Sequence, residues 1–129
     1  MSTLKVNTVQ HNTSGFNNVV QFTDGAGTEN GTLCRAWVRF TGQGTVTIGA
    51  SFNVSSITDD GTGQYRVNFS SSFSDVQYCF NCSTVVDNSS SSMFIGYITY
   101  NTTSTFGVGI YRNTVGFYDA DRVCCSFFR

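Results

Sequence analysis

The chain has 129 residues, which fits one folded domain better than two. Hydrophobic residues make up 40% of the chain and aromatic residues 15%, enough apolar surface to exclude a disordered protein. Only 12% of the residues are charged and the net charge is −1, so no positive field attracts nucleic acid or anionic lipid. No run approaches the roughly 20 apolar residues of a membrane helix. We therefore expect one domain that neither binds nucleic acid nor inserts into a membrane.

The first 30 residues differ from the rest of the chain. LKVNTVQ can form one short strand, whereas HNTSGFNN and TDGAGTENG are rich in turn residues and offer little apolar core. We interpret residues 1–30 as an extended arm that packs against a partner, and residues 31–129 as the folded domain. The opening residues lack the apolar core of a signal peptide, which favours synthesis in the cytoplasm without the secretory route.

The segment LCRAWVRF, residues 33–40, alternates with the period of two that a half-buried strand requires. One face is apolar and the other carries two arginines and the only tryptophan of the chain. The apolar positions are Cys34, Ala36, Val38 and Phe40, and the outward positions are Arg35, Trp37 and Arg39. A turn at TGQG and a second strand in TVTIGASF follow.

Further short strands follow to the end of the chain. Residues 59–63, DDGTG, join two β-rich runs, because glycine supplies the positive φ angles of such a turn. The later runs are VQYCFNCSTVV, MFIGYITY, STFGVGIY and VGFYDADRVCCSFF, and the serines Ser89, Ser90, Ser91 and Ser92 mark an exposed loop tip. The chain contains no proline and few strong helix formers in succession. These patterns predict an all-β antiparallel β-sandwich or jelly-roll-like domain.

Residues for nucleophilic or metal chemistry are sparse. The only histidine is His11, in the N-terminal arm, so we expect no histidine-assisted catalysis and no cofactor. Cys79 and Cys82 have the spacing of half a zinc site, and Cys124-Cys125 offers two more thiols. In a strand, the two cysteines of each pair point to opposite faces. Free thiols are therefore favoured over a zinc site.

Four carboxylates lie in two loops. Asp59 and Asp60 belong to a glycine-rich turn, and Asp119 and Asp121 precede the last strand. Calcium binding or paired acids for glycoside hydrolysis are the functional alternatives, and ordinary turn chemistry is the favoured interpretation.

Arg35, Trp37 and Arg39 form the main candidate for a binding surface. Arginine beside tryptophan can form a cation–π patch, and both residue types are enriched at the buried centres of interfaces. We favour contact with another subunit, with binding of a sugar or receptor as the alternative.

Several short motifs then follow one another between residues 36 and 78. They are Ala36–Phe40 (AWVRF), Gly42–Val46 (GQGTV), Asn53–Asp59 (NVSSITD), Gly61–Gly63 (GTG) and Tyr65–Phe69 (YRVNF). This segment resembles a module of tail fibres and other virion surface proteins from marine and cyanobacterial tailed bacteriophages. The opening MSTLKVNTVQHNTSG is also similar to the start of many such proteins. Arg39 stands where that family often has asparagine, and residues from Met93 onward match no pattern of the family.

The resemblance implies a virion location and no active site. We expect a non-enzymatic tail-fibre or appendage module for host attachment, a homo-oligomer and specifically a trimer. Its partners would be other virion proteins and a host surface glycan or protein, bound by loops containing Ser89–Ser92, Asp119 and Asp121. The alternative is a capsid decoration protein that grips the shell through its N-terminal arm. A polysaccharide depolymerase is a more distant third interpretation.

Overall fold

The computed structural model describes residues 19–24, 27–85, 94–112 and 116–129, and in these residues it contains strands and no helix. The predicted all-β class is therefore confirmed. None of the described residues belongs to a helix long and apolar enough to cross a membrane. The strands are β1 Val19–Asp24, β2 Gly27–Thr32, β3 Cys34–Thr41, β4 Thr47–Phe52, β5 Val54–Gly61, β6 Gln64–Phe69, β7 Cys79–Val85, β8 Phe94–Asn101, β9 Thr105–Arg112, β10 Gly116–Phe117 and β11 Arg122–Phe128.

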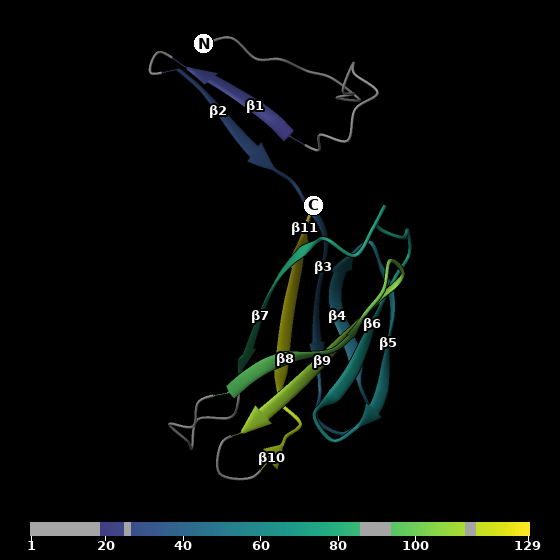
Figure 1. Cartoon of the computed structure of the whole chain (residues 1–129). Helices are drawn as coiled ribbons and strands as arrows, with labels where there is room; N and C mark the ends of the chain where they lie inside the picture. The colour runs from purple at the N-terminus through teal and green to yellow at the C-terminus, as the bar shows by residue number, and fades with distance from the viewer. Residues whose placement is uncertain (1–18, 25–26, 86–93, 113–115) are drawn as a thin grey trace.

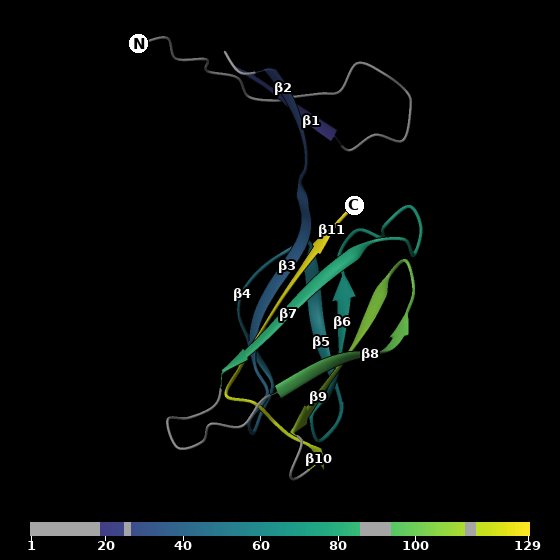
Figure 2. The same cartoon turned by 60° about the vertical axis from the view of Figure 1, so that its left-hand side comes forward.

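Two antiparallel sheets form the sandwich (Figures 1 and 2). The first sheet has the order β4-β3-β11-β7, so the last strand of the chain lies between the first and third strands of that sheet in sequence. The second sheet contains β5, β6, β9 and β8, and the short β10 pairs with the end of β9. The predicted β-sandwich is thus confirmed, with its strand order now defined.

The core lies between the two sheets and follows the alternation seen in the sequence. On β3, Ala36, Val38 and Phe40 are at most 1% exposed, while Trp37 between them is 40% exposed. Full burial of each large apolar side chain contributes about 1.5–3 kcal/mol to folding. The other core residues come mainly from β6, β9 and β11: Tyr65, Val67, Phe69, Phe106, Val108, Ile110, Val123, Cys125 and Phe127.

Aromatic rings make the principal contact between the sheets. The ring of Phe127 on β11 meets the rings of Phe69 on β6 and Phe106 on β9 edge-on, each at a centroid distance of 5.0 Å. Phe73 and Tyr78, from the connection between β6 and β7, pack onto Phe69 at 4.8 and 5.9 Å. Edge-to-face pairs contribute roughly 0.5–1.5 kcal/mol beyond the area they bury, so this aromatic cluster fixes how the sheets are stacked.

Asn53 allows the chain to pass from one sheet to the other between β4 and β5. Its φ angle is 53°, a left-handed conformation that asparagine tolerates better than most residues. Its Nδ2 atom donates to the carbonyl oxygens of Arg35 and Ser71, both at 3.1 Å, and its Oδ1 accepts from the Ser71 backbone N–H at 2.7 Å. The side chain therefore holds this corner against both β3 and the connection after β6.

The N-terminal part contains a separate two-stranded hairpin. β1 pairs with β2 from Val19 opposite Thr32 to Asp24 opposite Gly27, and neither strand pairs with the sandwich. Both views draw this hairpin beyond the end of the sandwich where the C-terminus lies (Figures 1 and 2). The predicted arm of residues 1–30 is, over its described part, a hairpin that continues to Thr32. Residues 1–18, including His11, lie outside the described residues. An isolated two-stranded hairpin is marginally stable in water, so a partner surface would stabilise it.

Gly63 and Gly44 provide a matched test of close packing at one end of the sandwich. Both have a φ angle of 64°, but only Gly63 is crowded: a Cβ there would lie 2.5 Å from the Tyr118 nitrogen and 2.7 Å from the Ile110 carbonyl oxygen. We expect Gly44→Ala to lower the free energy of unfolding by about 1 kcal/mol, from φ strain alone. Gly63→Ala should lower it by about 3 kcal/mol or more, because backbone atoms must also move. Urea unfolding measures both, and equal losses would contradict the crowding at Gly63.

Candidate functional site

Trp37 and Arg39 lie on the outer face of the four-stranded sheet, as predicted. Trp37 is directly opposite Phe52 of β4, and residues opposite one another in antiparallel strands share a face. Phe52 is 54% exposed, so two large aromatic side chains lie unburied next to each other. Sequence reasoning missed Phe52 as a neighbour of Trp37, because nothing in the sequence gives the register of the two strands.

Arg35 does not share this outer face, contrary to the alternation expected from the sequence. The pairing of β3 with β11 shifts by one residue here: Phe127 is opposite Ala36 and Phe128 is opposite Cys34, which leaves Arg35 at a bulge. Its guanidinium carbon lies 5.8 Å from the ring centroid of Phe73, a core residue. Arg35 therefore caps the aromatic cluster by a cation–π contact and leaves Trp37 and Arg39 as the outward pair.

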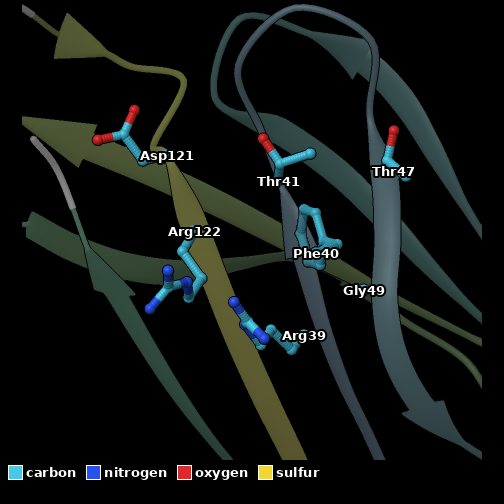
Figure 3. A pocket seen from close by; sticks show the side chains of 7 residues that line it. All are labelled: Arg39, Phe40, Thr41, Thr47, Gly49, Asp121 and Arg122. Carbon is cyan, nitrogen blue, oxygen red and sulfur yellow. The ribbon is translucent and has the colours of Figure 1, made fainter.

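A shallow hollow of about 260 Å³ opens on the same outer face, beside the turn between β3 and β4 (Figure 3). Arg39 and Arg122 contribute their side chains from the neighbouring strands β3 and β11, and Asp121 precedes β11. In Figure 3 the Asp121 carboxylate points away from the two guanidinium groups. The residues that line this Arg39–Arg122 hollow are Arg39, Phe40, Thr41, Thr47, Gly49, Asp121 and Arg122.

A bulge in β4 helps to shape the hollow. The register between β3 and β4 shifts between Arg39, which is opposite Ala50, and Phe40, which is opposite Ile48. The extra residue is Gly49, which has no side chain to fill the space beside β3. The sequence placed Arg39 and Asp121 among the candidates but missed Arg122 and both threonines of the hollow. The outward position of Arg122 in β11 follows from its alternation with Cys124 and Ser126. The pairing of β11 with β3, however, leaves no local signal in the sequence.

Asp119 has a structural position. Its Oδ1 atom accepts from the Gly63 backbone N–H at 2.6 Å and lies 2.8 Å from the Tyr65 hydroxyl, which also lies 3.0 Å from the Gly42 carbonyl oxygen. These bonds fasten the chain before β11 to the turn between β5 and β6. Burial raises the pKa of Tyr65 well above its usual value, and the hydrogen bond to Asp119 raises it further. Asp119, expected in a receptor-facing loop, therefore holds two turns together.

The two carboxylates of the first loop, Asp59 and Asp60, are also engaged locally. Asp60 binds the Arg66 guanidinium with both oxygens, at 2.6 Å from Oδ1 to Nη2 and 2.7 Å from Oδ2 to Nε. Asp59 accepts from the Gly61 backbone N–H at 3.0 Å, an ordinary turn contact that supports the interpretation as turn chemistry. The serines Ser89–Ser92 lie outside the described residues.

All five cysteines are free thiols in this structure. Cys79 is exposed while Cys82 on the same strand packs against the core, and Cys124 and Cys125 likewise point to opposite faces. Cys125 donates to the Sγ atom of Cys82, its cross-strand partner, at 3.6 Å. This hydrogen bond lowers the pKa of Cys82, and the same bond together with burial raises the pKa of Cys125. Within the described parts of the chain, no three His, Cys, Asp or Glu side chains come together as a metal site.

Comparison of the chain with protein-family models, with curated proteins and with solved structures finds no match to any of them.

Tyrosine ionisation should reveal the buried hydroxyls at alkaline pH. Burial raises the pKa of Tyr78 to about 12 and that of Tyr65 further, above the value near 10 of an unfolded chain. Protonated Tyr65 therefore contributes its full stability below about pH 10, and this contribution is lost as the pH rises through the folded pKa. Tyrosinate absorbance should show late ionisation of Tyr65 and Tyr78 that coincides with unfolding. Simultaneous ionisation of all tyrosines near pH 10 in a folded protein would contradict this assignment.

Thiol alkylation should separate the cysteines by burial. Cys79 is exposed and Cys125 is 3% exposed, so iodoacetamide should modify Cys79 in the folded protein and Cys125 only after unfolding. Peptide mass spectrometry against time, with and without urea, measures both rates. Labelling of Cys125 in the folded protein as fast as Cys79 would show that β7 and β11 separate readily.

Proposed function

We propose that this protein is a non-enzymatic structural protein on the surface of a tailed-phage virion, a small tail-fibre or appendage module that attaches to the host. The observation that carries the proposal is the outer face of the four-stranded sheet. Trp37 and Phe52 are exposed there, next to two arginines, Arg39 and Arg122, that form no ion pair within the described residues. Exposed aromatic and arginine side chains are the groups that dominate recognition surfaces.

Two further features support a virion role. The segment of residues 36–78 resembles a module of phage tail fibres, and in the structure that segment contributes β3–β6 and the connection that completes the aromatic core. The β1–β2 hairpin pairs with no strand of the sandwich, which suits an arm that docks on another virion protein. These features support assembly onto a larger particle.

Capsid decoration is the alternative function. The separate hairpin favours it, because decoration requires an element that grips the shell while the sandwich protrudes. In that case the hairpin and the preceding residues would carry the affinity for the virion, and the outer face of the sheet would be free.

A structural role is also consistent with the carboxylates of the two loops. A glycosidase would need two free carboxylates across a cleft, whereas Asp60 is bound to Arg66 and Asp119 to Gly63. We propose that these acids stabilise turns and perform no chemistry.

We further propose that the protein is a homo-oligomer, a trimer, whose subunits meet at Trp37 and Phe52, at the end of β4 away from the Arg39–Arg122 hollow, which stays open. Trp37→Ala should dissociate the oligomer, because it removes a large aromatic anchor without touching the core. Val76→Ala is the matched control, since Val76 is 44% exposed and lies in the connection between β6 and β7. Sedimentation velocity distinguishes the states. An unchanged oligomer in Trp37→Ala would place the interface elsewhere.

Immunogold electron microscopy of virions tests the function itself. We expect label at the tail, where an attachment module would lie. Label spread over the shell would instead support decoration, and label absent from the particles would contradict both virion roles.

A further inference from the structure

Arg39 and Arg122 differ from the other arginines of the described residues. Arg66 and Arg129 form ion pairs with Asp60 and Asp75 at 2.6 and 2.5 Å. The other two cap aromatic rings: Arg35 over Phe73 at 5.8 Å and Arg112 over Tyr118 at 5.3 Å. Within the described residues, only Arg39 and Arg122 have neither an ion pair nor a ring contact, and both line the same hollow.

Two guanidinium groups on neighbouring strands, against the single carboxylate of Asp121, leave the hollow with a local positive potential in a protein whose net charge is −1. An anion placed between them would relieve their mutual repulsion. The planar guanidinium group matches a carboxylate in particular, because two parallel N–H groups can donate to its two oxygens. The hollow is therefore suited to a carboxylate.

The remaining groups of the hollow suit a polyol better than a bare anion. Asp121 provides an acceptor carboxylate that points away from the arginines, and it makes no ion pair with them (Figure 3). Such a group repels a free anion but accepts hydrogen bonds from hydroxyl groups. The Thr41 hydroxyl, on the same rim, can donate and accept, whereas the Thr47 hydroxyl already donates to the Thr45 carbonyl oxygen at 3.1 Å and remains an acceptor.

The dimensions of the hollow agree with a small ligand. Its volume of about 260 Å³ is below the roughly 300–1,000 Å³ typical of pockets for drug-sized molecules, and it is open to solvent. One sugar residue of a longer chain could therefore occupy it while its neighbours extend along the sheet.

We infer that the Arg39–Arg122 hollow binds a carboxylate-bearing sugar residue, a uronate unit of an acidic surface polysaccharide. The arginines hold the carboxylate, and Asp121, Thr41 and Thr47 hold the ring hydroxyls. This inference rests on the proposed attachment function and names the chemistry of the receptor that the module would bind.

Calorimetric titration of the full chain with defined oligosaccharides tests the inference. The probes are oligogalacturonate and oligoglucuronate, with neutral galactose and glucose oligomers and inorganic sulfate as comparisons. We expect an acidic oligomer to bind at least tenfold more tightly than its neutral counterpart and than sulfate, with an affinity that falls as salt is added. Equal affinity for sulfate would reduce the hollow to a simple anion site, and equal affinity for neutral sugars, or binding to neither uronate, would overturn the inference.

Three variants locate the binding. Arg39→Gln and Arg122→Gln should each weaken uronate binding on the order of tenfold or more, because each removes a charge-assisted hydrogen bond. Arg66→Gln is the matched control: it removes the same charge from β6 in the other sheet, so it should leave the affinity unchanged. Both hollow arginines are exposed, so the variants should fold, which circular dichroism checks. An equal loss in Arg66→Gln would attribute the binding to net charge alone and overturn the site.

Uronate binding tests the hollow and immunogold labelling tests the attachment function, so the two proposals can fail separately. Immunogold label at the tail without uronate binding would leave the attachment role intact and refute the hollow as its receptor site. Uronate binding that depends on both arginines, with no label on virions, would establish the site and refute the virion role.

Discussion

The packing of Phe127 against Phe69 and Phe106 joins the two sheets, and the rest of the structure depends on it. Phe127 belongs to the last strand, which lies between β3 and β7, so the sandwich cannot close until the C-terminal end of the chain has paired. Pairing of strands that are far apart in sequence makes folding slow relative to local hairpins. The hairpins β3–β4 and β5–β6 are local, but the core that fixes their relative position is not.

The sequence predicted the parts of the fold that depend on neighbouring residues. Alternation on β3 correctly placed Ala36, Val38 and Phe40 inside and Trp37 and Arg39 outside, because side-chain direction in a strand follows directly from position. Alternation also separated Cys79 from Cys82 correctly. Arg35 was the exception: a bulge in β3 interrupts the period of two, and only the register of β3 against β11 reveals it.

The candidate site was predicted only in part, for a related reason. Arg39 and Asp121 were recognised individually, whereas Arg122 joins them only through the pairing of β11 with β3. Asp119 looked like an exposed loop residue because acidic residues near turns usually are. Its bonds to Gly63 and Tyr65, more than fifty positions away, are contacts that a single sequence does not encode in any local pattern.

The alternation on β3 has a consequence for how this protein could change over generations. Core residues and outward residues occupy separate positions of the same strand, so substitutions at Trp37 or Arg39 alter the surface without creating a cavity beneath it. Mutations on this face would then be selected by what it contacts, whereas those at Val38 or Phe40 would be selected by stability. Under selection to recognise a new surface, the outward residues of β3 could thus diversify while its inward residues are preserved.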